Sequence, residues 1–107
     1  MFGLFGKRKM DVGAATAFWK WFIEHEEWII SNIRTNGSAV VWAIDEQLKP
    51  IFPYFKKELE FQLGFNDGKG EFFFFHFGDK VLQKDAESLK EMMPTALTER
   101  WTFIAEK

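Results

Sequence analysis

The chain has 107 residues, of which 47% are hydrophobic and 28% charged, and its formal net charge is -2. This length fits one globular domain, and the nearly neutral balance offers no broad basic face for a nucleic acid. With no cysteine and only two histidines, disulfides and thiolate metal sites are excluded, and we expect no cofactor. One domain is expected over residues 1–107, with 1–13 as an N-terminal segment.

Aromatic residues are the unusual feature of the composition. They make up 19% of the chain, with 14 Phe and 5 Trp. Each such side chain buries about 150–250 Å², so a small core holds only some of them. The surplus is expected at the surface or in an interface.

The N-terminal segment places apolar residues before three consecutive cations at residues 7–9. A secretory signal has the opposite order, and no apolar run approaches the roughly 20 residues that cross a bilayer. We therefore expect a cytoplasmic protein with no integral membrane segment. A solvated tail is the simpler interpretation of the cations, and contact with an anionic membrane surface is the alternative.

Two helices are predicted in the first half of the chain. Apolar residues recur at helical spacing over residues 14–34, where Asp11 can cap the start and Asn36-Gly37 supplies a stop. A second helix is expected over residues 38–48 and should end at Pro50. The β-branched residues in its first half leave a strand as the alternative there.

Two strands are predicted next. Residues 58–65 alternate strictly between apolar and polar side chains, which is typical of a half-buried strand. A five-residue loop at 66–70 has hairpin composition, and residues 71–77 form the return strand. The two strands should therefore pair antiparallel.

The expected register of this hairpin assigns residues to the two faces of the sheet. Counting back from the five-residue loop, Glu60 lies opposite His76. Phe72 and Phe74 then lie on the face away from the main apolar set. That face would need cover, because phenylalanines of a bare sheet in water are an aggregation hazard.

A third helix and a last strand complete the predicted fold. Leu82, Ala86 and Leu89 recur at helical spacing, with Asp85 as a possible N-cap and Pro94 as the stop. Residues 100–107 alternate and predict a closing strand. The order α-α-β-β-α-β predicts an α+β domain: a three-stranded antiparallel sheet of order 2-1-3 with helices packed on one face.

Two aromatic motifs support a family resemblance. Residues 18–22 read FWKWF and residues 101–105 read WTFIA. Together they resemble a family of small uncharacterised bacterial proteins with an FWxWF-type first helix and a Trp-x-hydrophobic-hydrophobic-Ala last strand. The resemblance spans most of residues 18–107, and the chain departs from it at the aromatic stretch 72–77. It implies a cytoplasmic bacterial setting and brings no established activity, cofactor or catalytic residue.

Few residues are candidates for polar chemistry. His25 lies among glutamates on the first helix, and Glu60 opposite His76 could orient an imidazole. For both histidines a structural role is the simpler interpretation, as a helix residue at a packing edge and as half of a surface pair. We therefore expect no catalytic, cofactor-binding or metal site, and treat Glu60, His76 and His25 only as weak polar-site candidates.

The aromatic surplus carries the functional hypothesis. We expect a non-enzymatic protein-interaction module, either a homodimer or a binder of a single protein partner, which acts through an aromatic sheet face. Its immunity-type version, neutralisation of a toxin, rests on analogy. The alternative is a small-molecule-binding domain with an aromatic pocket between the helices and the sheet. The interface candidates are Phe72, Phe74, His76, Phe2 and Phe5.

Overall fold

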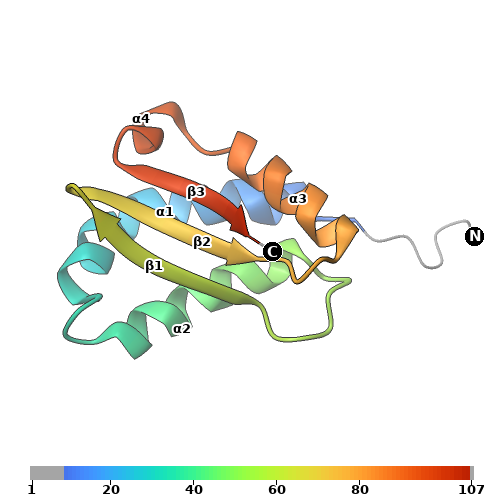
Figure 1. Ribbon diagram of the computed structural model, residues 1–107, viewed down its shortest axis with the longest axis horizontal. Helices are drawn as coiled ribbons and strands as arrows, with labels where there is room; N and C mark the ends of the chain where they lie inside the picture. Colours follow the sequence, from blue (N-terminus) through green and yellow to red (C-terminus); the bar gives the residue numbers. More distant parts are fainter. Residues whose placement is uncertain (1–8, 107) are drawn as a thin grey trace, which may run out of the picture.

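The computed structural model describes residues 9–106 and shows an α+β domain, as predicted (Figure 1). The elements follow the expected order, with a short 3-10 turn and a short fourth helix added. They are α1 (Val12–Asn32), α2 (Gly37–Leu48), η2 (Lys49–Ile51), β1 (Glu60–Asn66), β2 (Lys69–Phe75), α3 (Lys80–Glu91), α4 (Thr95–Thr98) and β3 (Trp101–Glu106).

The helix boundaries follow local capping. The Asp11 side chain accepts a hydrogen bond from the backbone N–H of Ala14 at 3.0 Å, which confirms the predicted start of α1. Residues 37–48 form α2 and not a strand, and the helix ends before Pro50. The prediction of Asp85 as the cap of α3 was wrong, because Asp79 accepts bonds from two N–H groups of the first turn at 3.1 and 3.0 Å.

The sheet is mixed, so the expected wholly antiparallel sheet of order 2-1-3 was wrong. The order is β1-β2-β3; β1 and β2 pair antiparallel, and β2 and β3 pair parallel. A helical crossover allows this parallel pairing. The physical reason for the order lies in composition: β2 has phenylalanines on both faces and takes the central place, whereas β1 carries Glu60 and Gln62 and tolerates an edge.

The hairpin turn is shorter than expected and shifts the register by one residue. Asp67 and Gly68 form a two-residue turn with φ of 54° and 76°, and both values match the type I′ turn that Asp-Gly favours. Glu60 therefore lies opposite Phe75 and not opposite His76. Because side chains alternate, this shift exchanges the two faces of one strand relative to the other.

The core lies between the sheet and the helices. In Figure 1, α1 and α2 lie behind the sheet and no described helix lies in front of it. Phe72 stacks on Phe103 at a centroid distance of 5.2 Å and meets Phe18 edge-on at 6.3 Å. The Trp19 indole N–H donates to the Leu89 carbonyl at 2.9 Å, which ties α3 to α1. Among residues 9–106, no helix combines the length and apolarity that a bilayer crossing requires.

Candidate interaction surface

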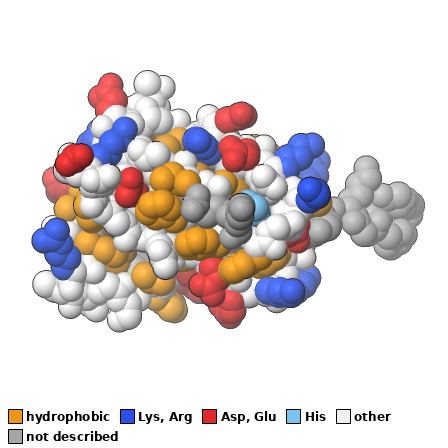
Figure 2. Space-filling view, in the orientation of Figure 1, with side chains coloured by type: hydrophobic (Ala, Val, Ile, Leu, Met, Phe, Trp, Pro, Cys, Tyr) orange, Lys and Arg blue, Asp and Glu red, His pale blue; other side chains and the backbone are white. Residues whose placement is uncertain are grey.

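The face of the sheet that the helices leave open carries a short apolar row. Gln62, Phe73 and Ile104 lie side by side across the three strands, and Phe75 follows two residues along β2. The three apolar side chains are half-buried, and Gln62 is exposed. Figure 2 shows hydrophobic side chains gathered over the middle of this face. We call Phe73, Phe75 and Ile104 the open-face row.

The predicted interface residues occupy different places. Phe72 and Phe74 are 1% and 0% exposed and belong to the core. Their assignment to the uncovered face was therefore wrong, and the one-residue register shift is the cause. His76 is also buried. Phe2 and Phe5 lie outside the described residues.

One aromatic residue in the turn after β2 has a backbone conformation that its side chain does not favour. Phe77 has φ of 54° and is 62% exposed. The left-handed region costs a bulky residue about 1–2 kcal/mol, and exposure returns little hydrophobic stabilisation. Such outliers concentrate at functional sites. Phe77 therefore combines backbone strain with an exposed ring in the turn that follows β2.

The weak polar-site candidates form local contacts. The His25 ring stacks on Trp21 at 4.7 Å, and its Nδ1 hydrogen-bonds the carbonyl of the same tryptophan at 2.8 Å. The His76 Nδ1 accepts a hydrogen bond from the Gly78 N–H at 3.1 Å. Glu60 is exposed at the edge of the sheet, and no hydrogen bond joins it to His76. The structure therefore does not bring the predicted Glu60–His76 pair together.

The main polar cluster was missed by the sequence analysis. Glu26 on α1 accepts two hydrogen bonds from Arg100, at 2.8 and 2.9 Å, and one from the Trp101 indole at 3.0 Å. The hydrogen bond from Arg100 is the largest cause that holds the pKa of Glu26 below its ordinary value, and Trp101 adds to it while burial opposes it. More than 70 residues separate the partners, so no local pattern signals the contact. It fixes the start of β3 against α1.

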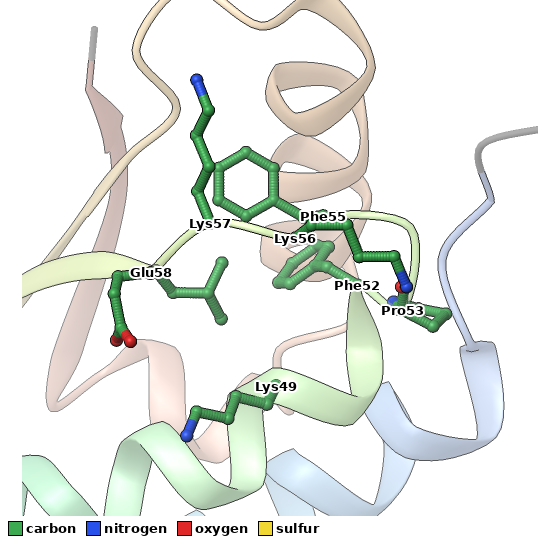
Figure 3. A pocket seen from close by; sticks show the side chains of 8 residues that line it. Lys49, Phe52, Pro53, Phe55, Lys56, Lys57 and Glu58 are labelled. Carbon is green, nitrogen blue, oxygen red and sulfur yellow. The ribbon is translucent and has the colours of Figure 1, made fainter.

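A hollow beside η2 has lysines at its rim, yet these do not converge (Figure 3). The Lys49 amine pairs with Asp45 at 3.1 Å and Glu46 at 3.3 Å, and the hydrogen bond with Asp45 is the main cause that raises the pKa of Lys49. The Lys56 amine donates to the Pro53 carbonyl at 3.0 Å. Lys57 extends away from Lys49 in Figure 3. The hollow therefore lacks the convergent polar groups that orient an anionic ligand.

Neither a metal site nor a similar protein of known function indicates what the described residues do. Within residues 9–106, no three His, Asp or Glu side chains gather closely enough to hold a metal ion. Comparison of the chain with protein-family models, with curated proteins and with solved structures finds no match. The resemblance to small bacterial proteins stays a prediction.

Proposed function

We propose that this domain is a non-enzymatic protein-interaction module that binds a protein partner through the open-face row. The observation that carries the proposal is that Phe73, Phe75 and Ile104 lie together on a sheet face without a described helix over it. Aromatic side chains dominate interface energies because they combine a large apolar area with few rotatable bonds. Phe77, two residues along the chain from Phe75, adds an exposed and strained aromatic side chain, which supports the same use.

The polar surroundings of the row favour a distinct partner over a second copy. Gln62 and Thr102 flank the row on the outer strands, and Glu71 lies beside Thr102. A polar rim around an apolar centre is the usual anatomy of an interface. Two copies stacked by this face would bring together like charges from Glu71 and Glu60, whereas a partner with basic groups would complement them.

The small-molecule alternative needs a pocket between the helices and the sheet. Aromatic rings occupy that space: Phe22 meets Trp101 at 5.1 Å, and Phe61 stacks on Phe72 at 5.4 Å. This packing among residues 9–106 supports the interaction module over the small-molecule alternative. An immunity-type role is the specific form of the interaction proposal, and the bacterial cytoplasm is the proposed setting on the sequence resemblance alone.

Site-specific photo-crosslinking tests the proposal. A benzophenone amino acid replaces Phe73 in the cells that naturally make the protein, and a matched chain carries it at Ile23, an exposed apolar position on α1. We expect one discrete adduct from position 73 and none from position 23. Equal adducts from both positions, or none from either Phe73 or Phe75, would contradict the proposal. An adduct of twice the chain mass would identify the partner as a second copy.

A further inference from the structure

A second surface lies between α2 and the beginning of β1. Four residues from one face of α2 and four from the chain entering β1 line an open groove, namely Ser38, Val41, Trp42 and Asp45 with Glu58, Leu59, Glu60 and Phe61. The apolar part of the groove lies on the other side of the sheet from the open-face row, because Phe61 pairs with Phe74, whereas Glu60 borders the row opposite Phe75. This inference does not rest on the proposed function.

The helix side of the groove exposes a large apolar anchor. Trp42 is 66% exposed, and Val41 beside it is also exposed. Opposite them, Leu59 and Phe61 are only half-buried. Tryptophan is the residue type most enriched at binding hot spots, because one side chain removes a large apolar area from water when it is covered.

The strand side of the groove is an open sheet edge. Among residues 9–106, β1 pairs only with β2, so no described strand lies along its outer side. Natural edge strands prevent further pairing with lysine, proline or bulges. The sequence of β1, EFQLGFN, contains neither lysine nor proline, and its single charged residue is Glu60 at the first position. Main-chain hydrogen bonds to an added strand are therefore opposed by negative charge alone, which a basic strand would complement.

Three of the residues that line the groove are acidic, namely Asp45, Glu58 and Glu60. Asp45 is paired with Lys49 at 3.1 Å, but Glu58 and Glu60 form no ion pair with any residue of the described range, and both are exposed. Figure 2 shows acidic side chains gathered near the start of β1. Cationic side chains on a bound molecule would complement the negative charge of Glu58 and Glu60.

We propose that the groove binds an extended peptide in which basic and apolar side chains alternate, and that the peptide adds as a fourth strand to β1. Side chains of a strand point alternately to the two faces of a sheet. One set would lie on the helix side, against Trp42 and Phe61, and is therefore apolar. The other set would lie on the side of Glu60 and is therefore basic. A second copy of β1 does not fit this chemistry, because Glu60–Asn66 contains no cation.

A peptide titration followed by NMR tests this proposal on the full chain. The probe is a seven-residue peptide that alternates lysine with valine and phenylalanine (KVKFKVK), and its charge-reversed counterpart is EVEFEVE. We expect KVKFKVK to shift the Trp42 indole signal and the β1 amide signals saturably. Trp42→Ala and the double variant Glu58→Lys with Glu60→Lys should each weaken binding by roughly tenfold or more. The matched control Glu87→Lys, an exposed position on α3, should bind as the unaltered chain does.

Several results would overturn the proposal. Equal binding of EVEFEVE would show adsorption by apolar contact alone, and equal binding by the double variant and Glu87→Lys would remove the charge argument. Shifts at the Phe73 and Ile104 amides in place of β1 would assign the peptide to the open-face row. Shifts of β1 signals with protein concentration alone, and none with peptide, would make a second copy the occupant. None of these results decides whether the open-face row binds a partner.

Discussion

The two faces of β2 show how four identical side chains acquire different roles. Phe72 and Phe74 point toward the helices and are fully buried, whereas Phe73 and Phe75 point to the open face and are half-buried. The residue type is the same on both faces, so the difference in burial arises because the helices cover one face of the sheet and leave the other open. A run of phenylalanines therefore identifies a central strand without showing which of its faces is the core.

Truncation of a phenylalanine should destabilise the fold far more on the helix face of β2 than on the open face. Phe72→Ala should lower the free energy of unfolding by about 3–5 kcal/mol, because it empties a packed site. Phe73→Ala should lower it by about 1 kcal/mol or less. Urea unfolding measures both values. If Phe72→Ala does not fold, the matched pair Phe72→Leu and Phe73→Leu serves in its place, and the larger loss is expected at position 72, because only that side chain is fully buried. Similar losses at positions 72 and 73 would contradict the assignment of the faces.

Gly70 and Gly64 lie on opposite faces of the sheet and allow the same comparison with a smaller change. A Cβ atom at Gly70 would lie 2.5 Å from the ring of Trp101, whereas at Gly64 it would meet nothing within 4 Å. Gly70→Ala should therefore displace the buried Trp101 ring and cost about 1–3 kcal/mol. Gly64→Ala should be neutral or slightly stabilising, because alanine loses less backbone entropy. Thermal unfolding compares the two variants, and equal midpoints would mean that Trp101 does not pack on Gly70.

The Glu26 cluster links β3 to α1, and its contribution depends on pH. The pKa of Glu26 is lowered in the folded protein, so its stabilisation is present above the pKa of the unfolded chain and is lost as pH falls through the folded value. Glu26→Gln should cost about 1 kcal/mol near neutral pH, and the difference from the unaltered chain should shrink toward acid pH. Urea unfolding across this range provides the measurement. A constant difference would indicate that the charge of Glu26 does not stabilise the fold.

The strained backbone of Phe77 should affect the free energy of unfolding only slightly. Phe77→Gly should raise the free energy of unfolding by about 0.5 kcal/mol, because glycine adopts the observed φ without strain but loses more entropy on folding. If Phe77 contributes to the interface, the same variant should weaken the crosslink from position 73. A destabilised Phe77→Gly protein would show that the exposed ring makes packing contacts that outweigh its strain.

Local chemistry made part of this fold predictable. The Asp11 cap, Pro50 and the alternation of residues 58–65 indicated helix or strand correctly, because each signal lies within a few residues of its effect. The predicted stop at Asn36-Gly37 was wrong, because α1 ends at Asn32 and Gly37 begins α2. The register was predictable in principle as well. Asp67-Gly68 is a strong two-residue turn signal, and its choice over the longer loop would have placed Phe72 and Phe74 in the core.

The remaining features depend on contacts between distant segments. The position of β3 beside β2 follows from which strand has two apolar faces to bury, not from any property of β3. The contacts of Glu26 with Arg100 and Trp101 join the first helix to the last strand. The exposure of Trp42 was equally inaccessible, because its helix pattern does not show how much of α2 the other elements cover. Such features are properties of the assembled fold.

The parallel pairing of β2 with β3 also determines when the chain is most vulnerable during folding. A hairpin such as β1–β2 closes in about 1–10 μs, but β3 reaches the other edge of β2 only after α3 and α4 have bridged the gap, and non-local closure of this kind is slow. Until then the four phenylalanines of β2 lie along an unpaired edge, which is the setting in which chains join edge to edge. Refolding yield should therefore fall with protein concentration more steeply than native stability alone implies.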